Sequence, residues 1–106
     1  APALKIVVSS FQAGSAKLTR GAQLDINTFA TFDNRPECHV VIQAYASVEG
    51  SDTENQRLSM QRAEAVAEAL VALGISRERL SPPAFGATEE FGEDYSSNRR
   101  AVIFYR

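Results

Sequence analysis

The sequence predicts a single α/β (α+β) domain in which two helices pack on a mixed four-stranded sheet. Three observations predict it: short β-branched runs typical of strands, two longer segments with apolar residues at helical spacing, and a length of 106 residues, which suits one small core. Strands and helices alternate through most of the chain, so the helices must cross over between strands and cover the sheet. We therefore expect the order strand, helix, strand, helix, strand, strand within one domain, residues 1–106.

The first half of the chain predicts a strand, a helix and a second strand. Residues 4–8 are apolar and largely β-branched, as in a strand. Thr19 suits the N-cap of a helix, and the turn residues 33–36, which include a proline, would end it. The buried stripe of this helix follows steps of four, four and three residues: Leu18, Ala22, Ile26 and Phe29. Residues 40–46 are apolar at nearly every position, which predicts a strand buried on both faces.

The second helix has two candidate starting points. Ser51 and Glu54 match a capping box, so a short helical turn is expected to begin there. Ser59 stands just ahead of the strongest helix-forming run and is a second N-cap candidate. Gly74 is the expected residue just past the helix end. The apolar stripe between these ends contains Leu58, Val66, Leu70 and Leu73.

The remaining segments predict two strands and a loop. Pro82-Pro83 interrupts the apolar segment 80–85. Because proline has no N–H to donate, that segment suits only a sheet edge or an extended chain. Residues 86–97 are acidic and rich in turn formers, which predicts an exposed loop, and residues 101–105 form the expected last strand.

The composition argues against several classes of function. The formal charge of −2 disfavours non-specific nucleic-acid binding, and no apolar run reaches the roughly 20 residues that span a bilayer. Cys38 and His39 are the only residues of their kinds, and as neighbours on a strand their side chains face opposite sides. We therefore expect no enzyme activity, no metal site and no cofactor. The chain begins Ala1-Pro2 without Met, which favours a processed or excised domain.

Arg62 is the residue most indicative of function. It lies four residues from both Leu58 and Val66, near the inward stripe of the helix, where a charge needs a partner. If the helix begins at Ser59, Arg62 lies in the first turn beside free backbone amides, and the combination suits a carboxylate ligand. The alternative is structural: Arg62 extends to solvent or pairs with one of the acids Glu49, Asp52 and Glu54.

Arg99 and Arg100 form a second basic feature at the start of the last strand. As neighbours on a strand they face opposite ways, so one can face a site while the other faces solvent. The alternative is that both are part of a solvated strand end.

Several motifs together resemble the OmpA-like C-terminal domain, a module of outer-membrane proteins, peptidoglycan-associated lipoproteins and flagellar stator proteins. The resemblance spans nearly the whole chain and implies a βαβαββ fold. It rests on Phe11-x-x-x-Ser15-x-x-Leu18, the strand 40–45, Gly50-Ser51-x-x-x-Asn55-x-x-Leu58-Ser59-x-x-Arg62-Ala63-x-x-Val66, Leu70-x-x-x-Gly74-Ile75 and Asn98-Arg99-Arg100-Ala101-Val102.

The resemblance implies non-covalent peptidoglycan binding in the periplasm. The zwitterionic end of the stem-peptide diaminopimelate would occupy the pocket. The family's ligand arginine falls on Arg62 and its loop asparagine on Asn55. The arginine of the Asn-Arg-Arg motif falls on Arg99 or Arg100. Gln12 stands where the family more often has Asp or Asn.

One position departs from the family pattern. Where the family has an aspartate that takes the diaminopimelate ammonium, this chain has Ser47. Losing a charge-assisted hydrogen bond typically costs about 1.5–3 kcal/mol, or roughly ten- to a hundredfold in affinity. Glu49 or Asp52 could reach in from the turn, but neither occupies the matching position. We therefore expect binding that is weakened or altered.

Two functions stay open at this point. The first is peptidoglycan binding through the diaminopimelate carboxylate, with Ser47 changing the preference. The second is a degenerate OmpA-like domain that acts as a structural or protein-interaction module. In either case we expect a periplasmic domain that is not itself inserted in a membrane. Segments outside this sequence would tether it to the outer membrane or cell envelope, in a barrel, lipoprotein or stator parent.

Overall fold

The computed structural model describes residues 4–8, 11–46, 51–81, 84–87 and 99–105. The predicted order of elements is confirmed, with one short 3₁₀ turn, η1, added after the second helix. The elements are β1 Lys5–Val8, α1 Arg20–Phe32, β2 Val40–Ala46, α2 Asp52–Ala72, η1 Arg77–Arg79, β3 Leu80–Ser81, β4 Ala84–Ala87 and β5 Ala101–Tyr105. Within these ranges, neither helix is long and apolar enough to cross a membrane.

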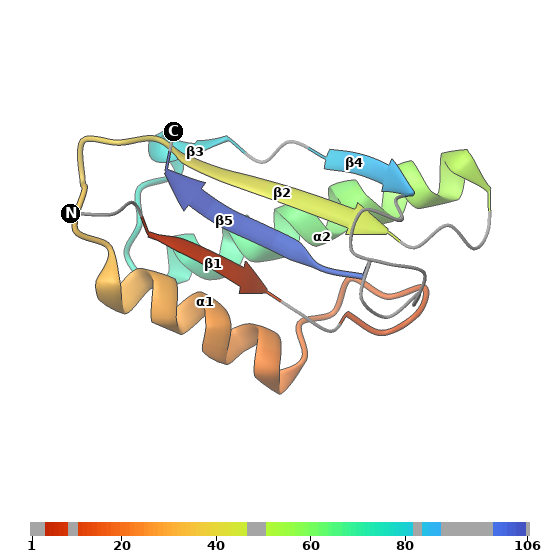
Figure 1. The fold of residues 1–106 in the computed structure, drawn as a ribbon, viewed down its shortest axis with the longest axis horizontal. Helices are drawn as coiled ribbons and strands as arrows, with labels where there is room; N and C mark the ends of the chain where they lie inside the picture. Colours follow the sequence, from red (N-terminus) through yellow and green to blue (C-terminus); the bar gives the residue numbers. More distant parts are fainter. Residues whose placement is uncertain (1–3, 9–10, 47–50, 82–83, 88–98, 106) are drawn as a thin grey trace.

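The sheet is mixed, as predicted. β5 lies between β1 and β2 and is antiparallel to both, whereas β3 and β4 are parallel to β2. β3 and β4 follow one another along the same side of β2, so they form the two halves of one interrupted edge strand (Figure 1). Pro82-Pro83 separates the halves. The expected edge position of this segment is therefore confirmed, and the sheet has four strand positions.

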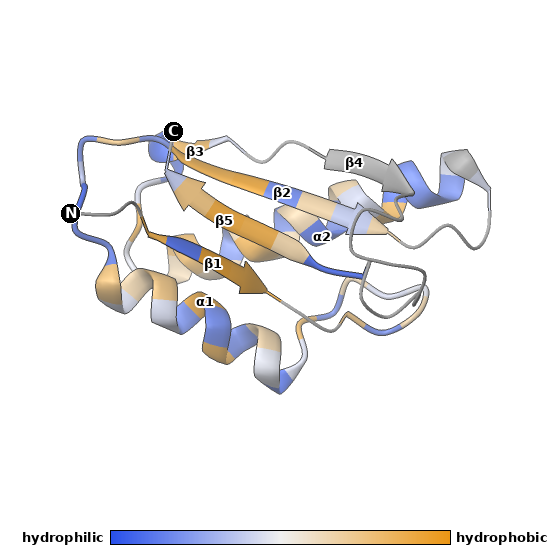
Figure 2. Ribbon diagram, in the orientation of Figure 1, coloured by the Kyte–Doolittle hydropathy of each residue, from blue (hydrophilic) through white to orange (hydrophobic). Residues whose placement is uncertain are grey.

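Both helices cover one face of the sheet. α1 packs along β1, and α2 packs across β2 and β4 (Figure 1). The ribbons of β1, β2 and β5 are coloured mostly as hydrophobic residues (Figure 2). One buried cluster joins both helices to the sheet, and its members include Ala22, Ile26, Phe29, Ala63, Val66, Leu70, Val8, Val40, Ile42, Ala101 and Ile103. Packing in this core sets the position of α2 relative to the end of β2, where the polar residues of the candidate site lie.

Three of the predicted helix ends are confirmed, two by hydrogen bonds and one by a backbone conformation. The Ala22 amide donates to the Thr19 hydroxyl at 3.1 Å, which caps α1. The Glu54 amide donates to the Ser51 hydroxyl at 3.1 Å, which caps α2. Gly74 has a φ of 101°, a conformation that favours glycine, and ends α2.

Ser59 is not an N-cap, contrary to one of the two candidates. α2 runs without interruption from Asp52 to Ala72, so Ser59 lies two turns inside it. Its hydroxyl donates to the carbonyl of Gln56 at 3.0 Å. A serine can therefore satisfy its hydroxyl on the preceding turn of a helix without ending the helix, and the sequence pattern does not distinguish the two cases.

Candidate functional site

The candidate site lies where the chain leaves β1, β2 ends and β5 begins. The Phe11 amide donates to the carbonyl of Arg99 at 3.0 Å, and the Tyr45 amide donates to the carbonyl of Arg100 at 2.9 Å. These two bonds hold the loop after β1 and the end of β2 on either side of β5. The buried polar residues of α2 pack against this junction.

Arg62 is the centre of the junction. Its side chain has 0% exposure, and its guanidinium donates to three backbone carbonyls from two segments. Nε donates to Ser15 at 2.9 Å, Nη1 to Tyr45 at 2.9 Å and Nη2 to Gln12 at 3.0 Å. The guanidinium carbon also lies 5.1 Å from the centroid of the Phe11 ring, within the range of a cation–π contact. Arg62 therefore ties the loop after β1 to the end of β2.

The structure tests part of the structural alternative for Arg62, in which it pairs with a nearby acid. Of the three acids considered as its partner, Glu54 forms an ion pair with Arg57 on the exposed side of α2. Glu49 and the side chain of Asp52 lie outside the described residues. The contacts described for Arg62 are to carbonyls and an aromatic ring, which suits a buried guanidinium because its N–H groups need acceptors.

The expected pairing of Arg62 with free helix amides is wrong. α2 begins at Asp52, so Arg62 is ten residues into the helix, about 15 Å along its axis. At that depth each backbone amide donates to a carbonyl of the preceding turn. The error follows from placing the helix start at Ser59.

Asn55, Ser59 and Arg62 form a polar stripe on the buried side of α2. Their spacing of four and three residues places them on one face, and their exposures are 3%, 0% and 0%. The Nδ2 group of Asn55 has no hydrogen-bond acceptor among the residues that the structure describes. A buried amide group without an acceptor lowers the stability of the fold, so its presence here requires an explanation. We call these three residues the polar stripe of α2.

The other predicted site residues fall into two groups. Gln12, Arg99 and Arg100 all lie at the junction, and each contributes a backbone carbonyl to it. The side chain of Gln12 is exposed, and Arg99 and Arg100 are both half-buried, so burial does not distinguish which of the two arginines faces a site. Ser47 lies outside the described residues.

A pocket of about 340 Å³ opens beside the junction. It is lined by Gln12, Ser15, Lys17, Leu18, Thr19 and Arg20, which connect β1 to α1 and begin the helix. Lys17 and Arg20 are not among the site residues predicted from the sequence. The sequence feature that could have indicated them is a pair of cations on either side of an N-cap, in a helix with no acid in its first turn.

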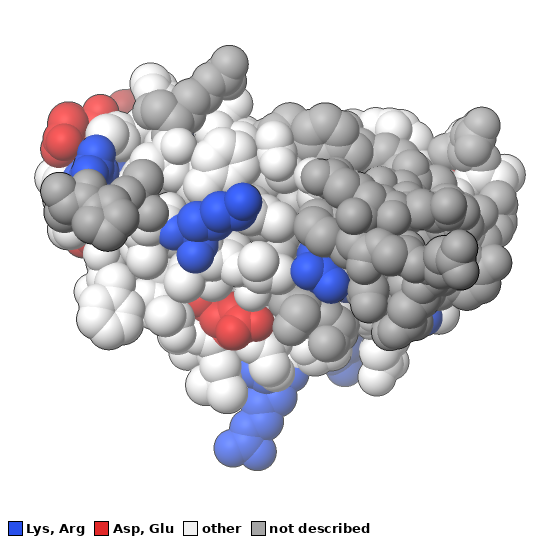
Figure 3. All heavy atoms as spheres, in the orientation of Figure 1, with Lys and Arg blue, Asp and Glu red and all other residues white. Residues whose placement is uncertain are grey.

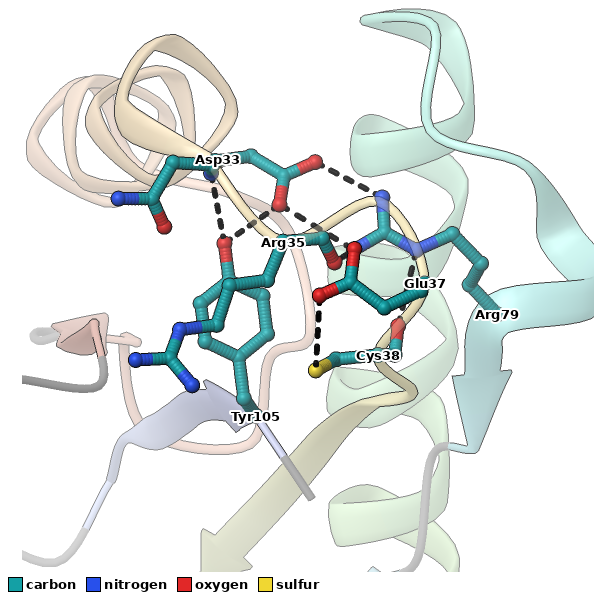
Figure 4. A network of polar contacts seen from close by, with 7 residues as sticks. Asp33, Arg35, Glu37, Cys38, Arg79 and Tyr105 are labelled. Atoms are coloured by element: carbon teal, nitrogen blue, oxygen red, sulfur yellow. Dashed lines mark hydrogen bonds and ion pairs between the residues drawn. The ribbon is translucent and has the colours of Figure 1, made fainter. Parts of the chain in front are cut away.

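A second polar network closes the opposite end of the sheet (Figure 4). Arg79 of η1 donates to the carboxylate of Asp33, at the end of α1, through Nη1 at 2.8 Å and Nη2 at 3.2 Å. The Tyr105 hydroxyl donates to the same carboxylate and accepts from the Asn34 amide. The hydrogen bonds from Arg79 lower the pKa of Asp33 to about 2, and burial raises the pKa of Tyr105. This network ties the chain after α1 to η1 and β5.

Comparison with known proteins identifies the family. The model of the OmpA family matches residues 10–103. The chain therefore belongs to the OmpA family and is an OmpA-like domain of the peptidoglycan-binding class, which is non-enzymatic. Outer membrane protein 40 of Porphyromonas gingivalis is 29% identical over 94 residues, covering 88% of this chain and 25% of that protein. The chain thus spans a quarter of the length of this relative.

Solved structures agree with the fold. The peptidoglycan-associated lipoprotein of Burkholderia pseudomallei superposes with a TM-score of 0.84 at 26% identity, covering 95% of this chain and 90% of that one. The OmpA-like domain of FopA1 from Francisella tularensis gives 0.84 at 24% identity, covering 96% and 71%. The periplasmic domain of Helicobacter pylori MotB gives 0.78 at 19% identity, covering 97% and 73%. The last two show the fold alone.

Proposed function

We propose that this domain binds peptidoglycan without a covalent step by recognising the carboxylate of the stem-peptide diaminopimelate at the junction around Arg62. Family membership and the likeness to a peptidoglycan-associated lipoprotein support this function. The observation that carries it is the buried Nδ2 of Asn55, which finds no acceptor among the described residues. A carboxylate oxygen of the ligand would supply an acceptor for this group.

In this proposal Arg62 supplies the positive charge. Its guanidinium has no exposed surface, so a ligand carboxylate reaches it only if atoms that now cover it move. The loop containing Gln12 and Ser15 contacts the guanidinium through backbone carbonyls. We therefore expect ligand binding to shift the amide resonances of this loop.

Ser47 is proposed to weaken the other half of the recognition. A serine hydroxyl hydrogen-bonds to an ammonium but brings no charge. Relative to an aspartate at this position, we expect affinity to be lower by roughly ten- to a hundredfold.

The test is binding of purified sacculi and of a diaminopimelate-containing tripeptide by the native chain and by Ser47→Asp. We expect weak binding by the native chain and binding stronger by roughly ten- to a hundredfold in the variant. Gln61→Asp is the matched control, because it adds the same charge on the exposed side of α2. Failure of both the native chain and Ser47→Asp to bind sacculi or peptide would refute the proposal.

The second candidate function is that of a structural or protein-interaction domain. It is favoured by the satisfaction of Arg62 through the chain's own carbonyls, which gives this residue a role in folding without any ligand. Absence of peptide binding by the native chain, together with its appearance in Ser47→Asp, would support this second function over the first.

We also propose a periplasmic location, with the domain tethered to the outer membrane or cell envelope, through a lipid anchor in a lipoprotein parent or through another segment. The outer-membrane name of the relative from Porphyromonas gingivalis and the likeness to a peptidoglycan-associated lipoprotein support it. Fractionation of cells that produce the parent protein tests the location: recovery of the domain in the cytoplasm would contradict it.

A further inference from the structure

We propose that the pocket at the start of α1 is a second anion subsite, which takes a further carboxylate of the same stem peptide. The inference rests on the proposed function, because it assigns the pocket to the ligand of the Arg62 junction. The pocket holds about 340 Å³ and is lined by Gln12, Ser15, Lys17, Leu18, Thr19 and Arg20. That volume lies at the small end of the range for ligand pockets and accommodates a short peptide segment.

The charge of the pocket points to an anion. Two of its six lining residues, Lys17 and Arg20, are cations, and none is an acid. Both side chains belong to exposed residues, and neither forms an ion pair within the described part of the chain. One basic side chain protrudes at the lower edge of the molecule, near the start of α1 (Figure 3). Two like charges that share a hollow without an acid favour a negatively charged ligand.

The start of α1 adds backbone donors to the same place. The Thr19 hydroxyl accepts from the Ala22 amide, which leaves the amides of Arg20 and Gly21 without a hydrogen-bond acceptor among the described residues. The first turn of α1 contains no acidic side chain. The positive end of the helix dipole and two open amides therefore face the region that Lys17 and Arg20 make basic.

The pocket is continuous with the Arg62 junction. Gln12 and Ser15 line the pocket, and their carbonyls accept hydrogen bonds from Arg62. One ligand can thus lie across this short loop, with one carboxylate at the junction and another in the pocket. A stem peptide has this chemistry, because it carries the glutamate carboxylate close in sequence to diaminopimelate. Two linked groups bind more tightly than either alone when the linker spans both sites.

The test compares two tripeptides that differ at one group, with the glutamate carboxylate either free or amidated. Titration calorimetry on the native chain should show a preference of roughly three- to tenfold for the free acid. The double variant Lys17→Gln/Arg20→Gln should bind both peptides as the native chain binds the amide. Lys5→Gln/Arg77→Gln is the matched control, because it removes two exposed cations outside the pocket and should keep the preference.

A second measurement locates the contact. In amide correlation spectra of the native chain, the resonances of Arg20 and Gly21 should shift with the free acid and stay in place with the amide. A preference that survives in Lys17→Gln/Arg20→Gln would overturn the subsite and leave the proposed function standing. Lack of binding of either peptide and of sacculi by the native chain would refute the proposed function itself, and the subsite with it.

Vesicles of anionic phospholipid provide the remaining comparison. Suppose that the native chain binds such vesicles, that Lys17→Gln/Arg20→Gln does not, and that the native chain shows no preference between the two peptides. The two basic residues would then bind a membrane surface. That result would overturn the peptide subsite.

Discussion

Arg79 holds the carboxylate of Asp33 at two points across 46 positions of sequence, with Nη1 at 2.8 Å from one oxygen and Nη2 at 3.2 Å from the other. The same guanidinium donates to the carbonyls of Arg35 and Cys38. A single side chain of η1 therefore contacts the connection between α1 and β2 at three residues. This end of the sheet is tied by an ion pair that is mostly shielded from solvent.

The first prediction concerns the stability that Arg79 confers. We expect Arg79→Met to lower the free energy of unfolding by about 2–4 kcal/mol, because Asp33 and two carbonyls lose their donors together. Urea denaturation measures the change. Arg77→Met is the matched control: its ion pair with Glu64 is half-exposed, so its loss should cost less than about 1 kcal/mol. Equal effects of the two substitutions would contradict the assigned role of Arg79.

The second prediction is a pH dependence. The pKa of Asp33 is about 2 in the folded state and 3.8 ordinarily, because Arg79 stabilises the charged form. A lowered pKa adds stability that is fully present above the unfolded value and is lost as the pH falls through the folded value. The contribution is about 2 kcal/mol. The difference in unfolding free energy between the native chain and Asp33→Asn should therefore shrink as the pH is lowered from about 5 towards 2. If the unfolding free energies of the two chains ran parallel over this pH range, the predicted contribution of Asp33 would be excluded.

The third prediction separates folding from binding at Arg62. Arg62→Met should lower the free energy of unfolding by about 3–5 kcal/mol, because three carbonyls lose their donors and the cation–π contact with Phe11 is lost. Arg62→Lys keeps the charge but not the forked geometry, so it should recover only part of this loss. Peptide binding must be measured well below the unfolding temperature of each variant. A variant that stays as stable as the native chain would show that the carbonyl contacts contribute little.

The fourth prediction concerns Asn55. Asn55→Leu replaces a buried amide that lacks an acceptor with an apolar side chain of similar size. We expect unfolding stability to stay the same or rise by about 1 kcal/mol, while binding of the diaminopimelate peptide falls. Ser59→Ala is the control, because the Ser59 hydroxyl donates within its own helix and its loss should affect neither property strongly. A large loss of stability in Asn55→Leu would show that the amide serves the fold.

Local patterns predicted the strands and helices well because each depends on neighbours in sequence. The stripe through Ile26 and Phe29 and the cap at Thr19 are confirmed for this reason, and Pro82-Pro83 placed its segment at an edge because proline has no N–H to donate. Ser59 misled because a serine can bond to the preceding turn as readily as it can cap a helix.

The features that sequence spacing missed depend on residues far apart in the chain. Arg79 meets Asp33 only after α2 and η1 have folded back over the sheet, and no local pattern indicates that contact. The acceptors of Arg62 are backbone carbonyls 17, 47 and 50 positions away, which have no side-chain signature. A pattern can show that an arginine is buried, but the acceptors it meets are set by the tertiary fold.

The interrupted edge formed by β3 and β4 also bears on how crowded copies of the domain behave. An unbroken outer strand presents a row of donors and acceptors to which another molecule can add its own strand. Here Pro82-Pro83 divides that row, leaving pieces of two and four residues, and the opposite edge, β1, has only four. Edge-to-edge strand pairing between neighbouring copies is thereby disfavoured at both borders of the sheet, which lowers the tendency of the domain to aggregate through β-structure.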